Sequence, residues 1–509
     1  MVYIKKNKNI NRTKKSRNRI AGEALASGGF GCIFKPALKC KNNKTRTTGV
    51  SKMSIEKHGK QEIAEINKIR DRLLKIKNYS KYYLLDVELC KPDKLSDDDL
   101  LHFNKKCYAL TRYNINEKNV NSRLNNITIL NMPNAGMDLK DWLLDDGKIT
   151  KEKLYKLNKL VIKLLKHGVR PMNKAGVIHN DLKDRNIMVD KEDNIRIIDW
   201  GLAGVVIDNT VPSEIMNRPL QFNTPFSSMI ISEEFKLNYN IFLKRVKDGI
   251  ILFDKANVRN YIINEYLIKL ARYYGYYDDN VILFNVIFSP GISDETFISE
   301  VKRNDLVEYG YYLYYLSNYI TDILMKYTTP SMEFDLDKYF MEVYLYNSDV
   351  FGLMTVYYNL FETKFENISL PSELIKIYLN RVRSLLIEYI YSNGGEKINI
   401  NNLIKAIEEL TLILNYNIKM DPLMDKKSPS SVANVNEILT MQSKSKSKSK
   451  SKSKTKSKSK SKSKSKSKTK SKSKSKSKSK SKSKSKSKSK ISKLLEADMS
   501  KIVTRMTNL

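Results

Sequence analysis

The chain has 509 residues, of which 41% are hydrophobic, and a formal net charge of +37. This length and apolar content allow at least one large core and favour two lobes, so we expect a folded, soluble protein. A transmembrane helix is excluded because no apolar run approaches the roughly 18 residues that a membrane span needs.

The positive charge is concentrated in two segments. Residues 443–490 alternate Ser or Thr with Lys and contribute +24, and the first twenty residues contribute +8, which leaves +5 for the rest of the chain. Neither segment has the apolar residues to fold alone, so both are predicted to be disordered. No apolar stretch follows the N-terminal charges, which excludes a secretory signal.

Four cysteines, Cys32, Cys40, Cys90 and Cys107, are scattered without a C-x-x-C pair. This spacing indicates neither a zinc site nor a disulfide framework. We therefore expect free thiols, a reducing compartment and a cytoplasmic location.

In chain order, the patterns predict strands first and helices later. The stretches LASGGFGCIFKPAL and GVSKM are predicted as strands around a glycine-rich turn. EIAEINKIRDRLLKI has apolar residues at helical spacing. YYLLDVELC and NITILNM are further strands, LYKLNKLVIKLLKHG is a helix, and residues 233–344 and the segment up to about residue 420 are mostly helical.

The glycine-rich turn contains Gly28, Gly29 and Gly31. Glycines at such a turn let backbone N–H groups approach a phosphate closely. An ordinary hairpin with glycines in its turn explains the same residues, and the turn alone does not decide between the two.

Lys52 follows about twenty residues later in an apolar strand. Its cation suits phosphates or a carboxylate on the next helix, where Glu62 is the first choice and Glu65 the reserve. Most Lys and Glu pairs are only surface charges, which is the structural alternative.

The stretch HNDLKDRNIMV at residues 179–189 is followed by NIRIIDW. Asp181 and Asn186 are predicted on a loop and Asp199 at a strand end, so their oxygen ligands suit Mg²⁺. Asp181 suits acceptance of a hydroxyl proton, and Lys183 suits stabilisation of a moving phosphoryl group. A polar hairpin that only caps turns would explain one of these residues, but not the set.

These motifs together resemble those of the protein kinase superfamily, and specifically the serine/threonine kinases of giant DNA viruses. The family's glycine loop resembles ASGGFGCI, its strand lysine GVSK, and its helix C glutamate Glu62. H-R-D-L-K-x-x-N resembles residues 179–186, D-F-G resembles residues 199–201, and the helix F signature resembles DVFGLM, where Asp349 is expected to support the catalytic loop backbone.

The resemblance implies ATP and Mg²⁺ or Mn²⁺ as cofactors. It implies Asp181, Lys183 and Asn186 as catalytic residues and Asn186 with Asp199 as metal ligands. Nucleotide contacts are implied for Leu25, Ala26, Ser27, Gly28, Gly29, Phe30, Gly31, Ile33, Lys52, Glu62, Met132 near the adenine and Asp138 near the ribose. Any strand-to-helix connection explains the last two equally well.

The implied fold class is α+β, a bilobal kinase-like fold with a β-rich N-lobe, an enlarged helical C-lobe and a disordered basic tail. The expected segments are a basic arm (1–20), an N-lobe (21–133), a C-lobe (134–424) with a helical insertion at about 233–344, a linker (425–442), the Ser-Lys repeat (443–490) and a short amphipathic helix (491–509). The insertion either covers the substrate groove, binds a partner or enlarges the lobe.

Two departures from the family pattern bear on regulation. Asn180 replaces the arginine that grips an activation-loop phosphate, so we expect activity without such a phosphate. The A-P-E motif is absent, and RPLQFNTPFSS at residues 218–228 stands in its region.

Two rivals to a serine/threonine protein kinase remain. Choline and aminoglycoside kinases share H-N-D-x-x-x-x-N and I-D-W, but Lys183 and the glycine of D-W-G favour protein substrates. An inactive scaffold is the other. The Ser-Lys repeat is either an anion-binding segment for nucleic acid or a membrane surface, a phosphorylation target of the enzyme itself, or an expansion without selected function.

Overall fold

The computed structural model describes residues 23–27, 31–41, 49–145, 147–216, 218, 220–267, 310–392 and 394–415. The chain divides into two compact units, of which the first comprises residues 1–287 and 315–416. The second unit contributes only residues 310–314 to the described part. The predictions for the basic arm, the linker, the Ser-Lys repeat and the final helix lie outside the described residues.

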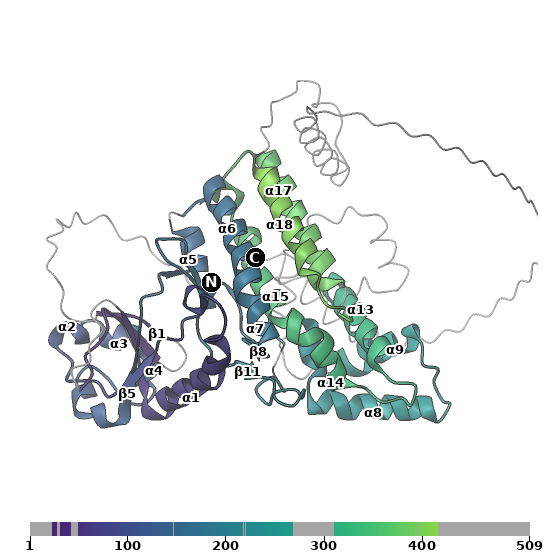
Figure 1. Cartoon of the computed structure of the whole chain (residues 1–509), viewed down its shortest axis with the longest axis horizontal. Coiled ribbons are helices and arrows are strands. Elements are labelled where there is room, and N and C mark those ends of the chain that lie inside the picture. Colours follow the sequence, from purple (N-terminus) through teal and green to yellow (C-terminus); the bar gives the residue numbers. More distant parts are fainter. Residues whose placement is uncertain are drawn as a thin grey trace, which may run out of the picture. The chain divides into compact units, whose positions relative to one another are not determined.

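A five-stranded antiparallel sheet forms the N-terminal part of the first unit (Figure 1). Its order is β1-β2-β3-β5-β4. The strands are β1 (Glu23–Ser27), β2 (Gly31–Lys35), β3 (Val50–Ile55), β4 (Glu88–Cys90) and β5 (Ile127–Met132). The predicted strands are therefore present, although β4 is shorter than the apolar stretch that predicted it.

Helix α1 (Glu56–Leu73) packs against β3 and β5. It buries Ile66, Ile69 and Leu73, three residues of the predicted apolar stripe. The short helices α2 (Asp97–Leu100), α3 (Phe103–Lys106) and α4 (Tyr108–Thr111) close the core around Phe34, Met53 and Ile129. Burial of these side chains removes apolar surface from water and holds the sheet in place.

The four cysteines form two disulfides, which contradicts the expectation of free thiols. Cys32 is bonded to Cys107 and Cys40 to Cys90, with Cα–Cα distances of 5.0 and 5.8 Å. The partners are 75 and 50 residues apart, so the short-range spacing of the cysteines could not predict these pairs. The inference of a reducing compartment, which rested on unpaired cysteines, loses its basis.

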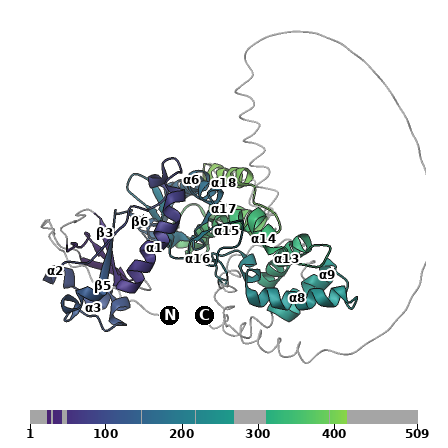
Figure 2. The ribbon, with the colours of Figure 1, turned by 60° about the horizontal axis from the view of Figure 1, so that its bottom comes forward.

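The rest of the unit is mainly helical. Its helices are α5 (Leu139–Leu144), α6 (Lys151–Leu164), α7 (Arg170–Lys174), α8 (Glu233–Lys247), α9 (Lys255–Tyr261), α13 (Gly310–Tyr327), α14 (Leu336–Tyr339), α15 (Leu345–Met354), α16 (Asn359–Glu362), α17 (Ser372–Leu386) and α18 (Ile400–Leu414). A π-helical turn at Leu165–Val169 joins α6 to α7. Helices α17 and α18 pack against each other, and α18 packs on α6 (Figures 1 and 2).

Short strands carry the polar motifs between these helices. They are β6 (Met137–Asp138), β7 (Ile149–Thr150), β8 (Val177–Ile178), β9 (Ile187–Val189), β10 (Ile195–Ile197), β11 (Gly204–Val205) and β12 (Ile368–Ser369). β9 and β10 form the predicted hairpin, and β11 pairs with β8. The α+β kinase-like fold class, with a β-rich first part and a helical second part, is confirmed.

The described residues of the predicted insertion are mostly helical. It contains α8, α9, a π-helical turn at Ile262–Leu267, α13 and α14. Within the described ranges, no helix combines the length and apolar character needed to cross a bilayer.

Candidate active site

Strand β3 and helix α1 bring Lys52 and Glu62 together. Nζ of Lys52 lies 2.8 Å from Oε1 of Glu62, and the two side chains are only 20% and 17% exposed. Burial alone lowers the pKa of Lys52, but the carboxylates of Glu62 and Asp199 outweigh it and the pKa ends above its ordinary value. Lys52 is thus a firmly charged cation near Asp199, and Glu62 rather than Glu65 is its partner.

The described part of the predicted glycine loop consists of strand residues. Leu25, Ala26 and Ser27 end β1, whereas Gly28, Gly29 and Phe30 lie outside the described residues. In β2, Ile33 pairs in register with Lys52. A Cβ at Gly31 would lie 2.7 Å from the carbonyl oxygen of Met53, so this glycine is needed for strand packing whatever it does for a phosphate.

The catalytic loop, residues 179–186, holds Asp181 in a dense set of donors. Lys183 Nζ and Asn186 Nδ2 both lie 2.9 Å from its Oδ2. Arg218 Nη2 lies 2.9 Å and Asn223 Nδ2 3.0 Å from its Oδ1. The three predicted catalytic residues therefore meet at this one carboxylate.

These donors set the charge state of Asp181. Burial raises the pKa of Asp181, but the hydrogen bonds from Asn223 and Lys183 and the charge of Arg218 outweigh it, so that the pKa ends below its ordinary value. The carboxylate is consequently ionised at neutral pH and fixed in orientation by both oxygens.

Asp349, on helix α15, supports this loop by accepting hydrogen bonds from its backbone. Oδ2 of Asp349 accepts the backbone N–H of His179 at 3.0 Å and Nδ2 of Asn173 at 2.7 Å, and Oδ1 accepts the N–H of Asn180 at 3.0 Å. The predicted support of the loop backbone by Asp349 is confirmed. Burial raises the pKa of the Asp349 carboxyl. The three hydrogen bonds offset the cost of burying this polar group in the interior.

Gly352 brings the same helix close to the loop. A Cβ at this position would lie 2.4 Å from the carbonyl oxygen of Leu182 and 3.1 Å from that of Asn223. The glycine of DVFGLM is therefore required by the approach of two backbones and not by a turn.

The segment before Asp199 is fixed by His179. Ring atom Nε2 of His179 donates to the carbonyl of Ile198 at 2.8 Å, and Nδ1 accepts the N–H of Asp181 at 3.3 Å. Trp200 is buried, and its ring centroid lies 4.9 Å from that of His179. Asp199 itself is exposed, with a backbone φ of 64° in the left-handed region that Asp tolerates.

Asn186 and Asp199 have the donor chemistry of a hard-cation site. Nδ2 of Asn186 is directed to Asp181, which leaves its Oδ1 for a cation. The N–H of Ile198 donates to the backbone carbonyl of Asn186 at 3.0 Å, and that bond brings the segment carrying Asp199 beside Asn186. An amide oxygen and a free carboxylate fit Mg²⁺ or Mn²⁺, which retain several waters.

Met132 and Asp138 lie on either side of the connection between the two parts. Met132 ends β5 and is half-buried. Oδ1 of Asp138 caps α5 by accepting the N–H of Asp141 at 2.9 Å, and its Oδ2 pairs with Arg185 at 2.8 Å. Both carboxylate oxygens thus already have protein partners, so contact with a ribose would have to compete with Arg185.

Arg218 and Asn223 are site residues that the sequence reasoning missed. They come from the irregular segment that stands where A-P-E is absent. The Arg218 side chain is 6% exposed and also donates to Gln221 at 3.2 Å. The sequence held no signal for these contacts beyond the position of RPLQFNTPFSS where A-P-E is absent.

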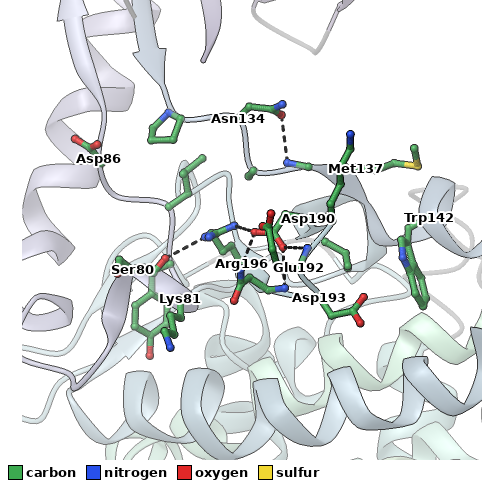
Figure 3. A pocket seen from close by; sticks show the side chains of 18 of the residues that line it. Ser80, Lys81, Asp86, Asn134, Met137, Trp142, Asp190, Glu192, Asp193 and Arg196 are labelled. Carbon is green, nitrogen blue, oxygen red and sulfur yellow. Dashed lines mark hydrogen bonds and ion pairs between the residues drawn. The ribbon is translucent and has the colours of Figure 1, made fainter. Parts of the chain in front are cut away.

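A separate cavity of about 1070 Å³ is lined in part by the connecting segment 133–137. Figure 3 shows Arg196 on its wall between Asp190 and Ser80, where Nη1 bonds Asp190 at 2.7 Å and Nε bonds the carbonyl of Ser80 at 3.0 Å. Lys52, Asp181 and Asp199 do not line it. This cavity is therefore distinct from the candidate active site.

Comparison with known proteins agrees with this geometry. Residues 103–220 match the family model described as protein kinase domain. A serine/threonine-protein kinase of Debaryomyces hansenii is 22% identical over 44% of this chain and 32% of its own length. The SNF1-related protein kinase catalytic subunit alpha KIN12 of Arabidopsis thaliana is 25% identical over 26% of this chain and 25% of its own length, and the kinase cds1 of Schizosaccharomyces pombe is 35% identical over 14% and 15%.

The chain thus spans at most 32% of the length of these relatives. The matched residues 103–220 include the catalytic loop, Asp199 and Arg218, the part of the site in which the polar contacts are densest. The fold and these contacts are kinase-like, and residues 103–220 are similar to the protein kinase domain.

Proposed function

We propose that the chain is an ATP-dependent serine/threonine protein kinase that transfers the γ-phosphate to hydroxyls of protein substrates. The observation that carries this proposal is the ionised, oriented carboxylate of Asp181 beside Lys183 and Asn186. Such a carboxylate positions a hydroxyl group and accepts its proton during phosphoryl transfer.

In the proposed reaction, the substrate oxygen bonds to the γ-phosphorus as the bond from that phosphorus to the bridging oxygen of ADP breaks. The hydroxyl proton passes to Asp181, and ADP takes the electron pair of the broken bond. Lys183, 2.9 Å from Asp181, would stabilise the charge that develops on the transferred group. Because the pKa of Asp181 is lowered, the carboxylate is ionised and available to orient the hydroxyl.

Lys52 would hold the phosphates of ATP, and Glu62 would hold Lys52 in position. Asn186 and Asp199 would bind Mg²⁺ or Mn²⁺, which supplies charge neutralisation to the phosphates when bound. The remaining nucleotide contacts, from Leu25 to Ile33 and at Met132 and Asp138, belong to the same proposal.

Serine/threonine specificity rests on Lys183 and on the names of two relatives. The likeness to kinases of giant DNA viruses, and with it a place of action in a host cytoplasm or virion, stays a prediction. So does binding of the Ser-Lys repeat to nucleic acid or an anionic membrane.

The test is transfer of labelled γ-phosphate by the full-length chain. A basic protein, an acidic protein and small amino alcohols are offered separately, and labelled sites are mapped by mass spectrometry. Asp181→Asn is the blank. Asp248→Asn, at an exposed carboxylate that follows α8, is the matched control for loss of one acid.

Label on Ser or Thr of protein that is absent in the blank and retained in the control supports the proposal. Label mainly on residues 443–490 would make the repeat a substrate of its own enzyme. Label only on small alcohols would replace the proposal by a small-molecule kinase, and no label despite ATP binding would replace it by a scaffold.

A further inference from the structure

A second, smaller cavity lies on the helical part of the first unit. Its volume is about 150 Å³, and it is formed by α7, by α15 and by the segment that leads into α18. Three cationic side chains line it, those of Arg170, Lys174 and Lys397, together with Asn and apolar residues. No Asp or Glu is among its lining residues.

The three cations are uncompensated in the described part of the chain. None of them forms an ion pair there, and the neighbouring acid, Glu396, is bound instead by Lys326 Nζ at 2.7 Å. Burial lowers the pKa of Lys397, and the charges of Lys174 and Arg170 lower it further. Like charges held together at one cavity are unfavourable unless an anion joins them.

All three residues are exposed, and the surrounding structure positions the charge of one of them, Lys397. Nζ of Lys397 lies 3.1 Å from the centroid of the Tyr346 ring, a cation–π contact that positions the ammonium group. The fifteen-residue helix α18 begins at the cavity, and Asn399 caps it by accepting the N–H groups of Asn401 and Asn402 at 3.1 and 3.2 Å. The positive end of the helix dipole therefore adds to the same field.

Asn173 supplies an independent sign of a missing partner. It lines the cavity and is 1% exposed, and its Oδ1 has no hydrogen-bond partner. Buried polar atoms are normally paired, so Asn173 is a point at which the wall of the cavity is not fully satisfied by protein contacts.

We propose that this cavity binds a phosphate-type oxyanion, either inorganic phosphate or a phosphate monoester. Three cations that line one small cavity match a compact group of high charge, and Arg170 offers the guanidinium geometry that suits such oxygens. The volume is below the roughly 300–1,000 Å³ of pockets for larger organic ligands, which favours an ion over a nucleotide. The inference does not depend on kinase activity.

The test compares three full-length proteins: the wild type, a Lys174→Gln/Lys397→Gln variant, and a Lys244→Gln/Lys247→Gln control with the same loss of charge on exposed α8. All three proteins keep the 24 lysines of residues 443–490. Weak binding of anions to that segment is therefore the same in each protein and does not affect the comparison. Inorganic phosphate, O-phosphoserine and, as a carboxylate control, acetate are titrated at constant ionic strength. Binding is followed by calorimetry and by the thermal unfolding midpoint.

We expect phosphate or phosphoserine to bind the wild type and the control alike, and the cavity variant at least about tenfold more weakly, as expected for the loss of charge-assisted hydrogen bonds. Tighter binding of phosphoserine than of phosphate would assign the site to monoesters, and the reverse to the free ion. Without added anion, the cavity variant should unfold at the same temperature as the wild type or higher, because repulsion is relieved. Equal binding by all three proteins, or a lower midpoint of the cavity variant without anion, would overturn the proposal.

Discussion

Arg218 Nη2 and Asn223 Nδ2 both bond Oδ1 of Asp181, at 2.9 and 3.0 Å, while Lys183 and Asn186 hold Oδ2. The segment after Gly201 therefore returns to the site and contacts the Asp181 carboxylate directly. Arg218 is almost fully buried. Its positive charge and the negative charge of Asp181 therefore compensate each other.

Replacement of Arg218 by Gln should lower kcat by about ten- to a hundredfold, because one charge-assisted hydrogen bond that orients Asp181 is worth about 1.5–3 kcal/mol. KM for ATP should be unchanged, since Arg218 contacts Asp181 and not the Lys52 region. Steady-state phosphate transfer measures both constants. Arg245→Gln, on exposed α8, is the matched control, and a changed KM for ATP with an unchanged kcat would contradict the assignment.

The same variant should change the acid dependence of stability. The pKa of Asp181 is lowered in the folded chain, so its ionised form stabilises the fold above the ordinary carboxyl pKa of about 3.9, and this contribution is lost as pH falls through the lower folded value. Arg218→Gln removes one cause of that lowering. The difference in unfolding free energy between wild type and variant should therefore be largest at neutral pH and shrink below about pH 4. Urea unfolding at several pH values measures it, and a difference independent of pH would speak against the ion pair.

Residues that are close in sequence, or that lie on regular elements, were predictable. Lys52 and Glu62 lie on a strand and on the helix that follows it, so their contact follows from local periodicity. The loop that carries Asp181 is bounded by two short strands, and residues 179–186 form one continuous stretch of it. Asp349 was placed correctly by the resemblance of its motif, because its 170-residue separation from His179 carries no local signal.

Contacts between irregular segments were not predictable in the same way. Arg218 and Asn223 are 37 and 42 residues from Asp181, in a segment without helical or strand periodicity. The disulfides depend on how the antiparallel sheet and its covering helices bring distant residues together. The ion pair of Asp138 with Arg185 was not predictable either, because it depends on the packing of α5 on the catalytic loop.

Replacement of Asp349 by Asn should destabilise the fold by about 1–3 kcal/mol, because the amide turns an NH₂ group toward donors and leaves one of them unpaired in the interior. The change should also abolish transfer, since the backbone of His179 and Asn180 loses its acceptor. Chemical unfolding at neutral pH measures the first effect. An unfolding free energy equal to that of the Asp248→Asn control would show that Asp349 does not hold the loop.

Gly352→Ala tests the close approach of α15 to the catalytic loop. Alanine favours a helix by about 1 kcal/mol over glycine, yet we expect a net loss of about 1–3 kcal/mol, because its Cβ would press on the carbonyls of Leu182 and Asn223. Gly168→Ala is the matched control: its Cβ would meet mainly the flexible end of Leu164, which can move. Thermal unfolding of the two variants should separate them, and equal midpoints would refute the packing argument.

Reduction of the two disulfides should destabilise the β-rich part of the unit. In the chain-entropy account, a disulfide typically contributes about 2–4 kcal/mol by restricting the unfolded chain, and the bonds here join residues 75 and 50 positions apart. The midpoint of thermal unfolding should therefore fall when a reductant is added. A variant with all four cysteines replaced by serine should unfold at the midpoint of the chemically reduced wild type. Addition of the reductant should not change that midpoint. Titration of denatured, unreduced protein with a thiol reagent should find no reactive thiol, and four reactive thiols would contradict the two bonds.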